Sequence, residues 1–102
     1  MATKTGERQL QSELHRIKGD FLLKTNLINA QAEFTKAIKI AAEQGARLFE
    51  LRATTSLARL LAKQGKHSEG RTMLAQIYNW FTEGFDTADL KDAKALLDEL
   101  NN

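Results

Sequence analysis

The chain of 102 residues contains no cysteine and no proline. Without cysteine it forms no disulfide, carries no thiolate nucleophile and builds no cysteine-ligated zinc site. Without proline it lacks the residue that interrupts helices most strongly. β-Branched residues are scarce, while Ala, Leu, Lys, Glu and Gln are abundant. This composition predicts an all-α protein.

The chain also lacks a strong charge of one sign and a long apolar run. Fifteen Lys and Arg against thirteen Asp and Glu leave a formal net charge of +2, too small for a dedicated nucleic-acid-binding domain. No apolar run approaches the roughly 18 residues that cross a membrane. Residues 1–10 have no apolar stretch of the signal-peptide kind. We therefore expect one cytoplasmic domain with no membrane partner. Nucleic-acid binding, suggested by the basic residues within 52–71, is the least favoured of the alternative functions.

Glycine residues and capping residues divide the chain into five expected helices joined by short connections. Because the connections are short, successive helices should run antiparallel. Ser68 is expected to cap the fourth helix, and Asp86 or Thr87 the fifth. The expected segments are a flexible tail (1–6), a first helical hairpin (7–45), a second hairpin (46–83) and a capping helix (86–101).

The two hairpins repeat one pattern of small and large residues at helical spacing. Small residues let two helices approach closely, and a large residue fills the hole between them. The pattern is typical of tetratricopeptide-like repeats, although its period is near forty rather than the usual ~34 residues. Phe34 and Leu74 should be the large residues that fill the hairpins. The pattern comprises Gly19, Ala30, Phe34 and Ala37 in the first hairpin, and Ala58, Gly70, Leu74 and Ile77 in the second.

Residues 45–100 resemble the C-terminal end of large bacterial signalling proteins. In those proteins an adenylate/guanylate cyclase or a winged-helix transcription-activator domain precedes a predicted ATPase and tetratricopeptide-like repeats. The resemblance covers about residues 10–100, through the run ELHRIKGDFLL (13–23) and, most specifically, the run WFTEGFDTADLK (80–91). The chain has no cyclase, ATPase or DNA-binding part. The resemblance therefore implies a non-catalytic interaction module and transfers no enzymatic activity.

No motif predicts an enzyme. The run GKHS (65–68) is similar to the end of a phosphate loop, but Leu60 stands where that motif needs its first glycine. His15 and His67 lie on different helices with no acidic residue at ligand spacing. The acidic residues within 86–99 are interleaved with lysine, which is typical of a solvated face rather than of catalytic carboxylates. We expect no catalytic residue, cofactor, metal site or small-molecule substrate.

Cations gather on the first helix of each hairpin, which lines the concave groove in tetratricopeptide folds. Arg52, Arg59 and Lys63 follow one another at steps of seven and four, so they share one helix face. Such a groove suits an acidic peptide or a free C-terminal carboxylate; a merely solubilising surface is the alternative. The expected groove residues are Arg16, Asp20, Lys24, Arg52, Thr55, Arg59 and Lys63.

The first hairpin has no earlier repeat on which to stack, so its outer face should carry uncovered apolar residues. A second copy that uses the same patch would cover it in a two-fold dimer. Exchange of a hairpin between copies and a monomer with a folded-back N-terminus remain open. Structural self-association is therefore the alternative to peptide binding as the function. The expected patch is Leu10, Leu14, Ile17, Leu27 and Ile28.

Four of the seven aromatic residues lie close together between residues 78 and 85. They are expected to join the second hairpin to the capping helix as part of the core. An exposed Trp80 that anchors a protein interface is the alternative, since tryptophan is enriched in such interfaces. The four are Tyr78, Trp80, Phe81 and Phe85.

Overall fold

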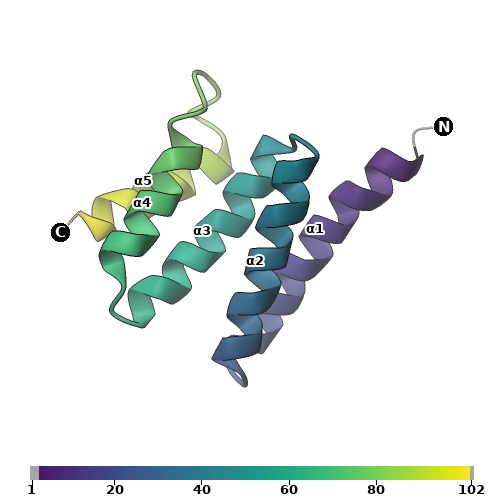
Figure 1. Cartoon of the computed structure of the whole chain (residues 1–102). Helices are drawn as coiled ribbons and strands as arrows, with labels where there is room; N and C mark the ends of the chain where they lie inside the picture. Colours follow the sequence, from purple (N-terminus) through teal and green to yellow (C-terminus); the bar gives the residue numbers. More distant parts are fainter. Residues whose placement is uncertain (1–2, 102) are drawn as a thin grey trace.

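The computed structural model describes the backbone of residues 3–101 and the side chains of residues 10–101. The described residues form five helices joined by turns and loops, without a β-strand, so the all-α prediction is confirmed. Successive helices pack as antiparallel neighbours (Figure 1). The helices are α1 (Thr3–Leu22), α2 (Leu27–Glu43), α3 (Arg47–Lys63), α4 (His67–Tyr78) and α5 (Ala88–Leu100).

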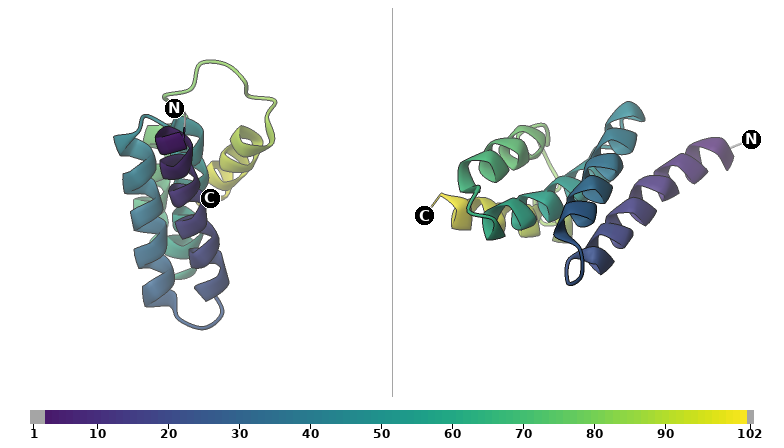
Figure 2. Two further views of the ribbon diagram at one scale, coloured as in Figure 1. Left: turned by 90° about the vertical axis from the view of Figure 1, so that its right-hand side faces the viewer. Right: turned by 60° about the horizontal axis from the view of Figure 1, so that its bottom comes forward.

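Alternate helices lie side by side in two layers. In Figure 1, α2 and α4 form the front layer, and α1, α3 and α5 form the back layer. The helix α3 contacts each of the other four helices. It is therefore the centre of the fold, with the α1–α2 hairpin on one side and the α4–α5 pair on the other (Figure 2).

Two glycines end helices as the sequence predicts. Gly45 and Gly65 have φ values of 68° and 82° and follow the C-cap residues of α2 and α3, Gln44 and Gln64. After each glycine, the next amide bonds back to the carbonyl of Ala41 or Leu61. This is the Schellman motif, in which a left-handed residue lets the last carbonyls of a helix find donors.

Other helix boundaries differ from the prediction. The helix α1 begins at Thr3, so residues 3–6 are helical rather than a tail; residues 1–2 lie outside the described part. Nothing in that stretch forbids a helix, since it contains no proline. The helix α4 begins at His67, so Ser68 lies inside it and does not cap it. Only Lys66 separates Gly65 from α4, which leaves no room for a later cap.

The core consists of two clusters that meet at α3. One cluster joins α2 to α3, and the other joins α3 to α4 and α5. Phe34 and Leu74 are fully buried, as predicted. The first cluster is Ala30, Phe34, Leu57, Leu60 and Leu61; the second is Leu51, Ala58, Leu74, Ile77, Leu90, Ala93, Leu96 and Leu100.

Glycine allows the closest approach within each hairpin. A Cβ atom on Gly19 would lie 2.5 Å from Cε1 of Phe34, and one on Gly70 would lie 3.1 Å from the carbonyl oxygen of Ala58. The first distance is too short for any other residue unless α1 moves away from α2. Gly70 brings α4 against the backbone of α3. The small-and-large pattern of the sequence therefore corresponds to real helix contacts.

Phe34→Ala should lower the free energy of unfolding by roughly 3–5 kcal/mol, and Leu74→Ala by roughly 2–5 kcal/mol. Each change leaves a cavity at a fully buried position. Chemical denaturation monitored by helicity measures both losses. The exposed Lys39→Ala on α2 serves as the control and should stay within about 0.5 kcal/mol of the parent. If the free energy of unfolding falls no further in either core variant than in the control, the packing described above is refuted.

Candidate functional site

The expected groove residues lie mainly on the back layer, but their chemistry differs from the prediction. Arg16 and Asp20 belong to α1, and Arg52, Arg59 and Lys63 belong to α3. Lys24 lies in the turn after α1. Thr55 is buried, and its hydroxyl donates to the carbonyl of Leu51 at 2.8 Å, so it offers nothing to a ligand.

The arginines of this surface are engaged with carboxylates of the same chain. Arg16 donates to Glu13 at 2.8 Å and to Asp20 at 3.1 Å. Arg52 donates through Nη1 to Glu13 at 2.8 Å and through Nε to Asp89 at 2.9 Å. The result is a continuous row of alternating charges, Asp20–Arg16–Glu13–Arg52–Asp89, that ties α1, α3 and α5 together.

The hydrogen bonds within this row of charges stabilise the ionised forms of Glu13 and Arg52. Burial raises the pKa of Glu13, but the hydrogen bonds from Arg16 and Arg52 outweigh it, so the pKa falls below its ordinary value of 4.5. Burial likewise lowers the pKa of Arg52, and the bonds to Asp89 and Glu13 outweigh it, so the pKa rises. Both groups stay charged at neutral pH, and the row is ionic under ordinary conditions.

The acidic residues of α5 therefore do more than solvate an outer face. Asp89 pairs with Arg52, and Asp92 pairs with Arg59. Asp92, Asp98 and Glu99 are exposed, as expected, and Asp98 bonds to Lys94 on the same helix. The expectation of a solvated acidic face is wrong for Asp89, which is half-buried against Arg52 because α5 lies beside α3 as a third back-layer helix (Figure 1).

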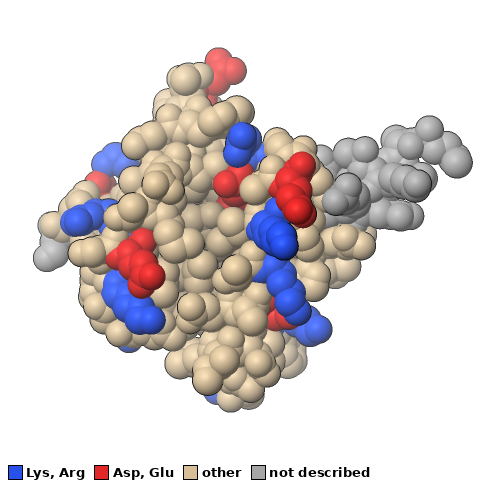
Figure 3. Space-filling model, viewed as in Figure 1, with Lys and Arg blue, Asp and Glu red and all other residues tan. Residues whose placement is uncertain are grey.

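Charges of both signs also mix on the front of the molecule. Figure 3 shows Lys and Arg beside Asp and Glu over α2 and α4, with neither sign gathered into a field. The lower end of this view, where the α1–α2 turn lies in Figure 1, is largely uncharged. Binding to a nucleic-acid backbone depends on a basic patch or stripe, and this face provides none.

The uncharged end belongs to an apolar face on α1 and the start of α2. All five residues of the predicted patch are exposed, and Phe21 continues their spacing at a step of four from Ile17. The sequence carried that signal for Phe21, although the predicted patch omits it. We call these six residues the N-terminal apolar face: Leu10 (58% exposed), Leu14 (56%), Ile17 (53%), Phe21 (83%), Leu27 (45%) and Ile28 (82%).

The opposite side of α1 is small and polar, and it is the side that contacts α2. Ser12 is buried and donates its hydroxyl to the carbonyl of Ala37 at 2.8 Å. Gly19 contributes the close approach to Phe34. Among the described residues of α1, only Ser12 and Gly19 are buried. The large apolar residues Leu10 to Phe21 therefore point away from the hairpin, and Figure 2 (left) shows α1 foremost at this end of the molecule.

One buried carboxylate completes the contact between α1 and α2. His15 Nδ1 lies 2.8 Å from Oε1 of Glu33, and Lys36 donates to the same carboxylate at 3.4 Å. The hydrogen bond with His15 lowers the pKa of Glu33 below its ordinary value of 4.5; burial opposes this effect and Lys36 adds to it. His15 is partly buried and has a structural partner, which matches its expected role.

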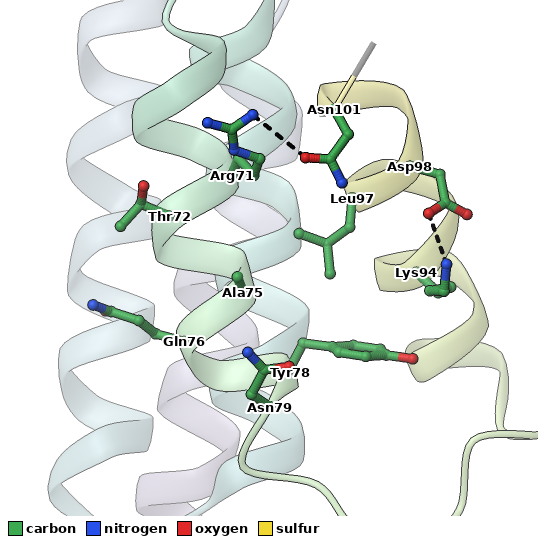
Figure 4. A pocket seen from close by; sticks show the side chains of 10 residues that line it. All are labelled: Arg71, Thr72, Ala75, Gln76, Tyr78, Asn79, Lys94, Leu97, Asp98 and Asn101. Atoms are coloured by element: carbon green, nitrogen blue, oxygen red, sulfur yellow. Dashed lines mark hydrogen bonds and ion pairs between the residues drawn. The ribbon is translucent and has the colours of Figure 1, made fainter.

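The other end of the molecule carries charged and amide side chains around a groove of mixed lining. An open groove of about 520 Å³ lies between α4 and α5. Figure 4 shows Arg71 reaching Asn101 across it, at 3.4 Å, and Lys94 bonded to Asp98 at 2.7 Å. Charged and amide side chains form most of its rim, with Leu97 between them. The two ends of the helical stack therefore differ in chemistry.

The aromatic residues between α4 and α5 divide into two pairs. Tyr78 and Phe81 pack against the core cluster, as expected. Trp80 and Phe85 are 55% and 44% exposed, so the expectation of an aromatic core is wrong for them. The guanidinium of Arg47 lies 5.3 Å from the centre of the Trp80 ring, and this cation–π contact holds the ring at the surface.

Two searches of the described residues give negative results. Among the side chains that the structure describes (residues 10–101), no group of three or more His, Cys, Asp or Glu is placed to hold a metal ion. None of the helices described above is long and apolar enough to cross a membrane.

No protein-family model matches the sequence, and no similar curated protein or solved structure was found. Function is therefore inferred from the surfaces of this chain.

Acidification should destabilise the protein through Glu13 and Glu33. Both pKa values are lowered in the folded state, so their contribution is complete above the ordinary value of 4.5 and disappears as the pH falls through the folded values. Urea denaturation at pH 7 and pH 3 measures the loss. Glu13→Gln and Glu33→Gln should each lose less stability between these pH values than the parent. An identical pH dependence in parent and variants would contradict the pairing.

Proposed function

We propose that this protein is a non-catalytic protein–protein interaction module of the tetratricopeptide-like kind, and that it binds through the N-terminal apolar face. The observation that carries the proposal is the exposure of six large apolar side chains on one side of α1 and α2. Together they present on the order of 600 Å² of apolar surface, about the largest patch that an ordinary monomer exposes. A partner removes that surface from water.

The periodic spacing of the face also supports a helical partner. Its residues on α1 follow one another at steps of four, three and four. This is the spacing at which one helix packs along another. Single exposed apolar residues are normal on a protein surface and need no explanation. A regular stripe over residues 10–21 of α1 does need one. The partner that fits such a stripe is another helix or helical hairpin.

The tetratricopeptide-like identity and the larger context belong to the same proposal. The close approaches of Gly19 on α1 to Phe34 on α2, and of Gly70 on α4 to Ala58 on α3, bring small residues to the helix contact of each hairpin and support the repeat. The resemblance of residues 80–91 to bacterial signalling proteins supports a role as the C-terminal helical-repeat part of such a regulatory system. In this role the module carries out no chemistry, and its output is the assembly it forms.

A photo-crosslinking amino acid in place of Ile17 tests the proposal. Irradiated cells that produce the protein should contain covalent adducts of discrete mass, because Ile17 lies at the centre of the exposed stripe. The same amino acid in place of Lys39, exposed on α2, is the matched control and should give none of these adducts. Absence of adducts at Ile17, or the same adducts at both positions, would overturn the proposal.

An acidic peptide on the back layer is a second candidate function. Lys24 and Lys63 are exposed and take part in no ion pair among the described residues. Lys24 follows the end of α1, and Lys63 is the last residue of α3. Because α1 and α3 are parallel, both lysines lie at the same end of the back layer. They are the cations of the expected groove that remain available to a ligand. The arginines would first have to exchange their own carboxylates, which makes this the weaker candidate.

A glutamate-rich peptide is the probe for the second candidate. It should bind the parent weakly and lose affinity as salt rises, because exposed charges are screened over ~8–10 Å. Lys24→Ala combined with Lys63→Ala should reduce the affinity at least roughly tenfold while leaving helicity intact, a loss of about 1.4 kcal/mol. Lys39→Ala is again the control. Equal binding by the double variant and the parent would exclude this function.

A further inference from the structure

We infer that the partner on the N-terminal apolar face is a second copy of this chain, packed head to head about a two-fold axis. The inference rests on the proposed function, since it names the occupant of the same face. Three features of the molecule select a second copy: the area of the face, the contrast between the two ends of the stack, and the pairing of the acidic residues beside the stripe.

The area of the face suits a dimer of modest stability. The apolar surface of about 600 Å² on each copy, with its polar border, gives roughly 1,200 Å² or more buried between two copies. Stable specific interfaces begin near that value. Among the described residues this is the larger of two groups of exposed apolar side chains, the other being Leu48, Trp80 and Phe85, so two copies cover the main apolar face of each other.

The contrast between the two ends disfavours head-to-tail stacking. A head-to-tail arrangement would place the stripe of Leu14 and Ile17 against the groove between α4 and α5 (Figure 4). The charged Arg71, Lys94 and Asp98 would then lose water and keep only the partners that they already have within the chain, which is costly. Head-to-head packing buries apolar surface against apolar surface. Such an isologous contact closes after two copies.

The acidic residues beside the stripe are paired within one copy. Glu13 and Asp20 flank it on one side, and both bond to Arg16. Lys18 lies on the other side and is exposed. An identical face brought against this one therefore meets no unpaired carboxylate on the acidic side of the stripe.

Sedimentation equilibrium of the full chain measures the assembly directly. At micromolar concentration we expect a mass twice the 11.4 kDa of one chain. Leu14→Glu combined with Ile17→Glu should weaken the dimer at least roughly 100-fold, because it would bury carboxylates in an apolar contact. Leu48→Glu, at an exposed apolar site beside Trp80, is the matched control and should remain dimeric. Circular dichroism checks that each variant stays helical.

The absence of cysteine allows a second test of the two-fold arrangement. Leu14→Cys and Ile17→Cys place single thiols near the middle of the stripe, where a two-fold axis brings equivalent residues together. At least one of them should form a disulfide-linked dimer on mild oxidation, since a disulfide needs Cα atoms within about 7 Å. Lys39→Cys should stay monomeric on a reducing-agent-free gel.

The outcomes separate the inference from the proposed function. If the parent sediments at 11.4 kDa, or if a dimer survives the double glutamate change, the inference of a second copy is overturned. If Ile17 still crosslinks to a protein of another mass in cells, the face binds a different partner and the proposed function stands. If neither a dimer nor an adduct forms, both the inference of a second copy and the proposed function fail. Linkage through Lys39→Cys alone would place the contact on α2 and also overturn the inference.

Discussion

The close approach of α1 to α2 at Gly19 determines how α1 is turned, and the exposed apolar face follows from it. A side chain at this position would collide with the fully buried ring of Phe34. Gly19 and Ser12, seven residues apart, therefore face α2 together. The large residues of α1 must then point away, because a helix cannot present both sets to one neighbour. The N-terminal apolar face is the geometric consequence of a tight hairpin.

The back layer is held by ion pairs in addition to packing. The row from Asp20 to Asp89 links α1, α3 and α5, and Arg59 with Asp92 adds a second ionic link between α3 and α5, which also share a core cluster. Partly exposed ion pairs contribute little individually, about 0–1 kcal/mol each. Their larger effect is on binding, since they occupy the cations that an acidic ligand would need.

Local patterns in the sequence predicted much of this structure. The all-α class, the antiparallel hairpins, the burial of Phe34 and Leu74, and the exposure of Leu14 and Ile17 all follow from helical spacing. Each of these features depends on residues within one helix or one hairpin. The Schellman ends at Gly45 and Gly65 follow from backbone preferences that act over a few residues.

Features that depend on how separate hairpins meet could not be predicted in the same way. The pairing of Arg52 with Asp89 joins residues far apart in the chain and requires α5 to lie along α3. The exposure of Trp80 depends on where the connection to α5 runs and on Arg47 from another helix. Ser68 has the chemistry of a cap, but the tight turn after α3 places it inside the helix.

The central claim is that packing at Gly19 turns the stripe of α1 outward, onto a second copy of the chain. Isotope-filtered NMR on a mixture of ¹³C-labelled and unlabelled chains tests it most directly, through the methyl groups of Leu14 and Ile17. The account predicts nuclear Overhauser effects from these methyls to the equivalent residues of the other copy. The absence of any such effect between the two copies would contradict it.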